Sequence, residues 1–112
     1  MIHQEAEVIC ERLGAIEGVA SVTRGWPKRL IRLPCIAVVK AADTPVAFWD
    51  DREQAAQLEY YVRIFAYEAQ QADQLAQHVD ETMEELGYVR TFAYDSDEAD
   101  VRMAALRYRK YV

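Results

Sequence analysis

Two stretches of the chain carry apolar residues every three to four positions, the spacing that brings side chains to one face of a helix. Near the N-terminus these residues are Ile2, Ala6, Ile9, Leu13 and Ile16. In the second stretch they are Ala72, Leu75, Ala76, Val79, Met83 and Leu86. Gly87 follows the second stretch and is of the residue type that most often ends a helix. We therefore expect one helix over roughly 3–16 and another over roughly 72–86.

Elsewhere apolar residues alternate with polar or aromatic ones, which is the pattern of strands. The longest such run, 58–67, has aliphatic residues on one face and aromatic or charged residues on the other. Shorter runs predict strands at 19–23, 34–39, 46–49, 88–94 and 103–112.

Three connections between these strands have recognisable composition. Asp43-Thr44-Pro45 predicts a turn before the run at 46–49. The segment 50–57 is a polar connector for which the pattern leaves both a helical and an irregular structure open. The acidic run at 95–100 predicts a solvated loop between the last two strands, because it lacks the glycine and the final glutamate of a calcium-binding EF-hand loop.

The element order predicts an α+β fold, with a mixed or antiparallel β-sheet of about five or six strands and two α-helices packed on one face. The chain has 112 residues, too few for two independent cores, so a single domain is expected over 1–112.

The sheet face turned away from the helices is rich in tyrosine, phenylalanine and arginine. These residue types are enriched where protein surfaces meet, although tyrosine also favours strands for its own sake, and both interpretations stay open. The candidate interface residues are Tyr61, Arg63, Phe65, Tyr67, Arg107, Arg109 and Tyr111.

The segment 24–33 combines helix-breaking and strand-breaking residues with four basic side chains. It is either a connector that packs Trp26, Leu30, Ile31 and Leu33 against the core or a basic arm that docks on an acidic neighbour. The candidate docking residues are Arg24, Trp26, Lys28, Arg29 and Arg32.

The charge, hydropathy and cysteine content of the chain argue against several classes of function. The net charge is −6, most of it from residue 57 onward, which argues against a protein that binds nucleic acid by neutralising phosphates. No stretch is apolar enough to span a bilayer and no secretory signal is visible, so we expect no membrane association. Two cysteines in such a chain are expected to be reduced thiols.

Residues that could carry chemistry are few. His3 lies near the terminus, and His78 has no second histidine four positions away to complete a metal-binding pair. Cys10 and Cys35 fall at positions typical of small core residues. We therefore expect no enzyme activity, no catalytic residues, no metal and no cofactor; a small enzyme using His78 with Asp80, or a cysteine, is the least favoured hypothesis.

The chain resembles the small tail-terminator and tail-completion proteins of tailed bacteriophages and prophages. The resemblance covers almost the whole chain and lies in the order of its parts: a helix, a short strand, Arg24-Gly25-Trp26-Pro27, a β-branched strand from Pro34, a long aromatic strand, an amphipathic helix, and a hairpin ending in Arg107-Tyr108-Arg109.

This resemblance implies a structural subunit of a ring, usually hexameric, that caps the tail tube, ends its polymerisation and joins the tail to the neck and head. The implied partners are other copies of the chain, the tail tube protein and a head-completion or neck protein, with DNA passing through the lumen without specific binding. The implied location is the tail or neck of the virion, after assembly in the host cytoplasm. The alternative is a small-molecule-binding or regulatory domain, ferredoxin-like and dimeric.

Overall fold

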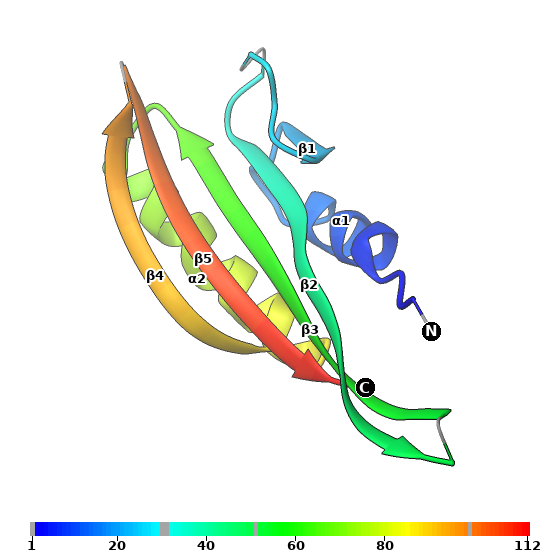
Figure 1. Ribbon diagram of the computed structural model, residues 1–112. Coiled ribbons are helices and arrows are strands. Elements are labelled where there is room, and N and C mark those ends of the chain that lie inside the picture. Colours follow the sequence, from blue (N-terminus) through cyan, green and yellow to red (C-terminus); the bar gives the residue numbers. More distant parts are fainter. Residues whose placement is uncertain (1, 30–31, 51, 99) are drawn as a thin grey trace.

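The chain forms one curved sheet with two helices on one side, in a computed structural model that describes residues 2–29, 32–50, 52–98 and 100–112 (Figure 1). In chain order the elements are α1 (Ala6–Gly14), β1 (Ser21–Arg24), β2 (Cys35–Trp49), β3 (Arg52–Ala66), α2 (Ala69–Glu85), β4 (Val89–Glu98) and β5 (Val101–Tyr111). Over the described residues the sheet has five strands in the order β1-β2-β3-β5-β4. The predicted α+β fold is confirmed.

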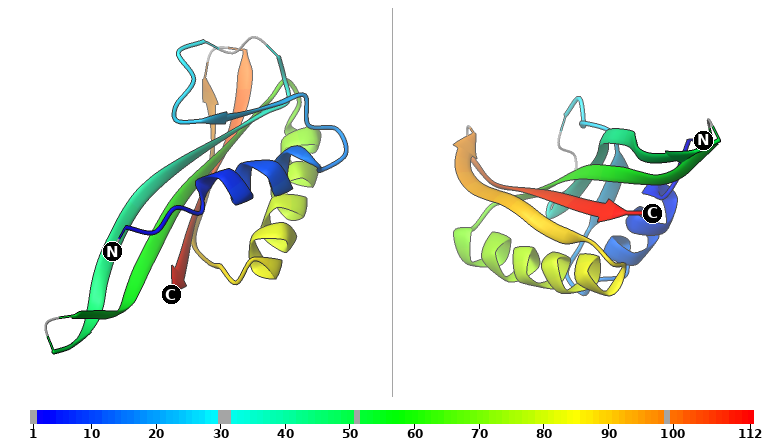
Figure 2. Two further views of the ribbon diagram at one scale, coloured as in Figure 1. Left: turned by 90° about the vertical axis from the view of Figure 1, so that its right-hand side faces the viewer. Right: turned by 60° about the horizontal axis from the view of Figure 1, so that its bottom comes forward.

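All neighbouring strands are antiparallel except β1 and β2, which run parallel. The right-hand view in Figure 2 shows α1 and α2 beneath the sheet, on the same side. Their apolar stripes meet the aliphatic face of β2, β3 and β5 in the main core, whose largest members include Ile9, Leu13, Ile36, Val38, Val62, Ile64, Val79 and Met83. Burial of this apolar surface is the principal driving force for the fold.

Two buried tyrosines keep their hydroxyl groups bonded at the edge of this core. The Tyr108 hydroxyl donates to Asp80 Oδ1 at 3.0 Å, and the Tyr60 hydroxyl accepts from the backbone N–H of Glu5 at 3.3 Å. Burial, then the Asp80 carboxylate, raises the pKa of Tyr108 well above its usual range. Both rings therefore contribute apolar area without leaving a hydroxyl group unsatisfied.

Helix α2 ends as its sequence predicts. Gly87 has φ of 91°, its N–H bonds the carbonyl of Glu84, and the N–H of Tyr88 bonds the carbonyl of Met83. This is the Schellman arrangement, which requires a left-handed residue at the position of Gly87. The helix begins at Ala69, about one turn before the first buried residue of its stripe, Ala72.

The first helix is shorter than predicted, at 6–14 instead of 3–16. The backbone N–H of His3 donates to Asp43 Oδ2 at 2.7 Å. This contact holds the chain before α1 beside β2, where it cannot take helical geometry. At the other end, the backbone N–H of Ala15 donates to the carbonyl of Arg12, and that of Ile16 donates to the carbonyl of Leu13.

The turn predicted at 43–45 is wrong, because β2 runs straight through it to Trp49. Pro45 lies opposite Ala56, whose N–H and C=O both bond Val112 on the other side, at 2.9 Å each. The missing N–H of Pro45 therefore falls where β3 needs no donor, a position at which proline is tolerated in a strand. The predicted strand at 46–49 and the connector 50–57 consequently belong to one long β2-β3 hairpin.

The solvated loop predicted at 95–100 is also wrong, because β4 continues to Glu98. β4 is an edge strand, where charged side chains are accepted and discourage pairing with other chains. Asp97 is further held by Arg102 of β5, whose Nη1 lies 2.7 Å from Asp97 Oδ1. Asp95 and Asp97 therefore lie on an edge strand, whereas Asp100 lies in the turn before β5.

Candidate interaction surface on the outer sheet face

The face of the sheet opposite the helices, here called the outer face, collects the aromatic and arginine side chains. The register of β3 with β5 places Tyr61 beside Arg107 and Arg63 beside Ala105. Arg109 and Tyr111 continue along the same face of β5. The alternation read from the sequence therefore placed these residues on one surface correctly.

Two further aromatic residues join the outer face through a bulge in β4. The register shifts between Arg90 and Phe92, and the hydroxyl of the intervening Thr91 donates to the carbonyl of Arg107 at 3.4 Å. A bulge reverses the alternation of side chains, so Phe92 and Tyr94 point to the outer face. The sequence alone carries no clear signal for this bulge, so its pattern did not predict either residue on the outer face.

Rings and guanidinium groups alternate across the centre of the outer face. The guanidinium of Arg63 lies 4.0 Å from the centroid of Trp26, and Trp26 stacks on Tyr61 with 6.3 Å between centroids. Arg107 then lies 5.2 Å from the centroid of Tyr61 and 5.5 Å from that of Phe92. Cation–π pairs of this kind contribute about 0.5–1 kcal/mol each at exposed sites, so the array orders side chains that would otherwise be free.

Not every predicted interface residue belongs to this array. Phe65 is only 7% exposed and packs in a second apolar cluster with Cys35, Ala37, Met103 and Ala105. Tyr67 is 67% exposed but lies past the end of β3, in a depression shared with the start of α2. Phe65 is therefore buried and not available as an interface residue. Tyr67 is exposed but does not belong to the array of rings and guanidinium groups.

The array surrounds a hollow of about 240 Å³ lined by Tyr61, Arg63, Phe92, Tyr94, Ala105, Leu106 and Arg107. Pockets that hold small molecules usually measure about 300–1,000 Å³, so this hollow is better matched to a side chain of a protein partner. The Nε of Arg107 is buried there and has no hydrogen-bond acceptor within the described parts of the chain. For the guanidinium group of Arg107 as a whole, a carboxylate on a partner is the best-matched acceptor.

The segment 24–33 divides its roles between packing and charge. Trp26 lies on the outer face, and Leu33 packs on the second apolar cluster, as the connector interpretation expects. The predicted packing of Leu30 and Ile31 lies outside the described residues. The basic side chains of the predicted docking arm are exposed: Arg24, Lys28, Arg29 and Arg32. Figure 2 shows residues 24–29 on the side of the sheet opposite the helices.

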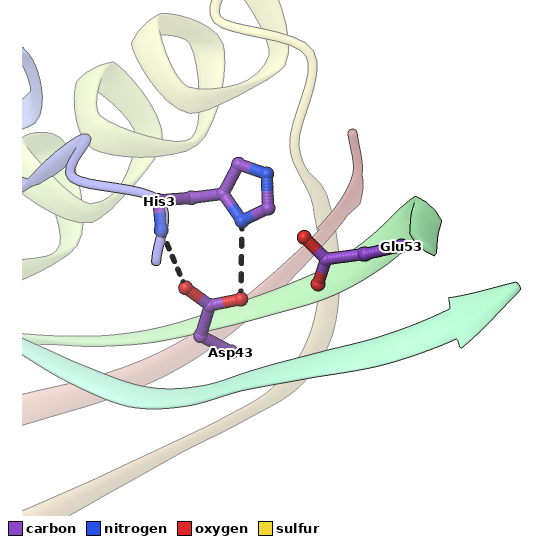
Figure 3. Close-up of side chains that lie close together, drawn as sticks. All are labelled: His3, Asp43 and Glu53. Atoms are coloured by element: carbon purple, nitrogen blue, oxygen red, sulfur yellow. Dashed lines mark hydrogen bonds and ion pairs between the residues drawn. The ribbon is translucent and has the colours of Figure 1, made fainter. Parts of the chain in front are cut away.

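A separate cluster of His3, Asp43 and Glu53 lies where the N-terminal segment meets the hairpin (Figure 3). Their ligand-type atoms lie within 4.8 Å of one another, and His3 Nδ1 is 3.2 Å from Asp43 Oδ1. The ammonium of Lys40 lies 3.1 Å from Asp43 Oδ2 and also contacts the carbonyl of His3. Because a cation already neutralises Asp43, we interpret the cluster as a clamp for the N-terminal segment.

The pKa of Asp43 reports the same contacts. This pKa is lowered to about 2, and the hydrogen bond from the backbone N–H of His3 is the largest cause. Burial opposes the shift, and the side chains of His3 and Lys40 add to it. Hydrogen bonds to the charged form of a carboxylate have this effect. The clamp is therefore strongest where Asp43 is ionised.

The remaining candidates for chemistry are His78 with Asp80 and the two cysteines. His78 is exposed on α2 with Nδ1 3.9 Å from Glu81, whereas Asp80 accepts from the Tyr108 hydroxyl. Cys10 is half-buried, and burial raises its pKa, the opposite of what an activated thiolate needs. Cys35 is buried in the second apolar cluster.

No helix in the described part of the chain is long and apolar enough to cross a membrane. No protein-family model matches the sequence, and no curated protein matches it significantly.

Proposed function

We propose that this chain is a subunit of a ring in the neck of a tailed bacteriophage, where it caps the tail tube, ends its polymerisation and joins it to the head. The observation that carries the proposal is that one small domain has two different exposed surfaces rich in aromatic side chains. One is the outer face with its hollow, and the other is the end of the long β2-β3 hairpin.

The hairpin end is unusually apolar for an exposed structure. Phe48 is 62% exposed and Trp49 is 72% exposed, with Val46 close behind them on the same strand. Large exposed apolar patches usually mark interaction sites. Two unlike surfaces that recognise each other form a heterologous contact, which closes into a ring when the rotation between copies allows it.

The charges suit the other roles of such a ring. Each copy contributes −6, and a ring of copies with acidic groups toward its lumen repels the phosphates of passing DNA. The exposed basic side chains of segment 24–33 are then available to dock on a tail tube protein or a head-completion protein. The ring would belong to the tail or neck of the virion and would assemble in the host cytoplasm, with no cofactor and no enzymatic step.

A small-molecule-binding dimer is the second candidate, but the element order α-β-β-β-α-β-β is not the β-α-β-β-α-β order of the ferredoxin-like domain expected from the sequence. The hollow is lined by two guanidinium groups and three aromatic rings, which would bind a planar anion by ion pairing and stacking. The small volume of the hollow favours the ring.

The proposal is tested by deleting the gene from its parent phage or prophage and measuring tail length by electron microscopy. Overlong tails without heads are the expected result. Tails of normal length that fail to attach to heads would place the protein at another joint of the neck. Intact, infectious particles would refute the phage-assembly function and favour the small-molecule alternative.

A further inference from the structure

We infer that the end of the β2-β3 hairpin of one copy seats Trp49 in the outer-face hollow of the next copy, with Asp50 beside Arg107. This inference deepens the proposed ring function and rests on it. It names both halves of the contact that builds the ring.

The hairpin is shaped to reach a neighbour. The molecule measures 53 × 26 × 23 Å, and Figures 1 and 2 show the hairpin extending past the helices and the end of β5 along the long direction. Register shifts between Lys40 and Ala42 and between Pro45 and Ala47 mark bulges in β2. Bulges bend and twist a strand, so this hairpin leaves the plane of the main sheet.

The hairpin cannot fill the hollow of its own chain. Trp49 pairs with Arg52, which is nine residues from Tyr61 along β3. At about 3.3 Å per residue in a strand, the two ends of that span are roughly 30 Å apart. Continuous pairing of β2 with β3 keeps the strands extended, so Trp49 can enter such a hollow only in another copy.

The two surfaces are complementary in chemistry. The hollow offers the rings of Tyr61, Phe92 and Tyr94, and its guanidinium groups belong to Arg63 and Arg107. The hairpin end offers an exposed indole followed directly by the exposed carboxylate of Asp50. Asp50 has φ of 52°, a turn conformation that aspartate tolerates, so it lies at the point of the hairpin.

Such a pairing has the composition of an interface hot spot. Tryptophan, tyrosine and arginine dominate the binding energy of protein interfaces when they are packed together and desolvated. The carboxylate of Asp50 would pair with the guanidinium of Arg107 in a charge-assisted contact. Each copy would provide one hairpin end and one hollow, so a closed ring leaves neither surface exposed.

The test uses one variant in each surface and measures mass in solution by light scattering or sedimentation. Trp49→Ala removes the anchor, and Arg107→Ala removes a wall of the hollow; Tyr94→Ala is a second variant of the hollow in case Arg107→Ala disturbs folding. Val8→Ala on α1 and Arg90→Ala, both exposed away from the two surfaces, are matched controls. We expect a ring for the wild type and both controls, and monomers for the three test variants.

Mixing the variants tests the pairing itself. Copies carrying Trp49→Ala keep an intact hollow, and copies carrying Arg107→Ala keep an intact hairpin end. Their mixture should therefore give heterodimers with a single contact and no rings. Failure of the mixture to associate would overturn the pairing of these two surfaces.

The remaining outcomes separate the inference from the function. A wild type that stays monomeric at its highest attainable concentration would overturn ring formation and this contact together. A wild-type ring that stays intact in all three test variants would overturn only the contact and leave the ring to another surface. Circular dichroism spectra of all variants establish that a loss of mass is not a loss of fold.

Discussion

Replacing Trp26 by alanine measures how firmly segment 24–33 is attached to the outer face. The substitution removes a ring stacked on Tyr61 with planes 18° apart and a cation–π contact with Arg63 at 4.0 Å. Aromatic pairs contribute about 0.5–1.5 kcal/mol and exposed cation–π pairs about 0.5–1 kcal/mol. Trp26 is also only 42% exposed, so some apolar burial is lost as well. We expect the free energy of unfolding to fall by about 1–3 kcal/mol.

The assay is urea unfolding followed by circular dichroism, because the change removes a fluorescent residue. One kcal/mol moves the melting temperature of a domain near this size by about 4–8 °C, so thermal melts give a second reading. Trp26→Phe keeps a stacking ring and should recover most of the loss, and Lys28→Ala, an exposed change in the same segment, should cost less than about 0.5 kcal/mol. A loss below about 0.5 kcal/mol for Trp26→Ala would show that the stack does not hold the segment in place.

Three further predictions concern the core, a helix end and the N-terminal clamp. Met83→Ala should cost about 2–5 kcal/mol in urea unfolding, because Met83 is fully buried between α2 and the sheet and leaves a cavity; a loss near that of an exposed α2 change would contradict this packing. Gly87→Ala should cost about 1–2 kcal/mol, because φ is 91° there and a new Cβ would lie 3.4 Å from the Lys110 side chain; an unchanged melting temperature would count against the helix end described. Asp43 has its folded pKa lowered to about 2, so its contribution to stability is fully present above its unfolded pKa of about 3.9 and disappears as the pH falls toward 2. In Asp43→Asn, stability measured by urea unfolding should therefore fall less steeply over this pH range, and an unchanged slope would refute the clamp.

The outer face was partly predictable because alternation in a strand is a local property. Once the aliphatic residues of β3 and β5 face the helices, Tyr61, Arg63 and Arg107 must face away from them. The same reasoning could not find Phe92 and Tyr94, since the bulge at Thr91 changes their face without changing their spacing. It also could not separate Phe65 from its neighbours, because the cover over Phe65 comes from Leu33, Cys35 and Met103, distant in the chain.

In the sequence, the hairpin end is only a short predicted strand at 46–49 between a predicted turn and a polar connector. Its importance depends on β2 continuing through Asp43-Thr44-Pro45, a segment with strong turn composition. The bonding of Ala56 to Val112, far away in the sequence, leaves Pro45 at a position that needs no N–H donor. A segment with turn composition can therefore form a strand when its proline lies where the neighbouring strand needs no N–H donor.

The sequence by itself determined the elements whose signal is periodic and local: helix α2 with its ending at Gly87, the aliphatic face of β3, and hence an α+β fold with helices on one side. Burial of a stripe or of one strand face stabilises these elements wherever their partners lie, so their pattern is sufficient. Only the tertiary structure decided the length of the β2-β3 hairpin, the position of Trp26 on Tyr61, and the hollow around Arg107. Each of these depends on contacts between residues far apart in the chain, and such contacts form only when the sheet is assembled.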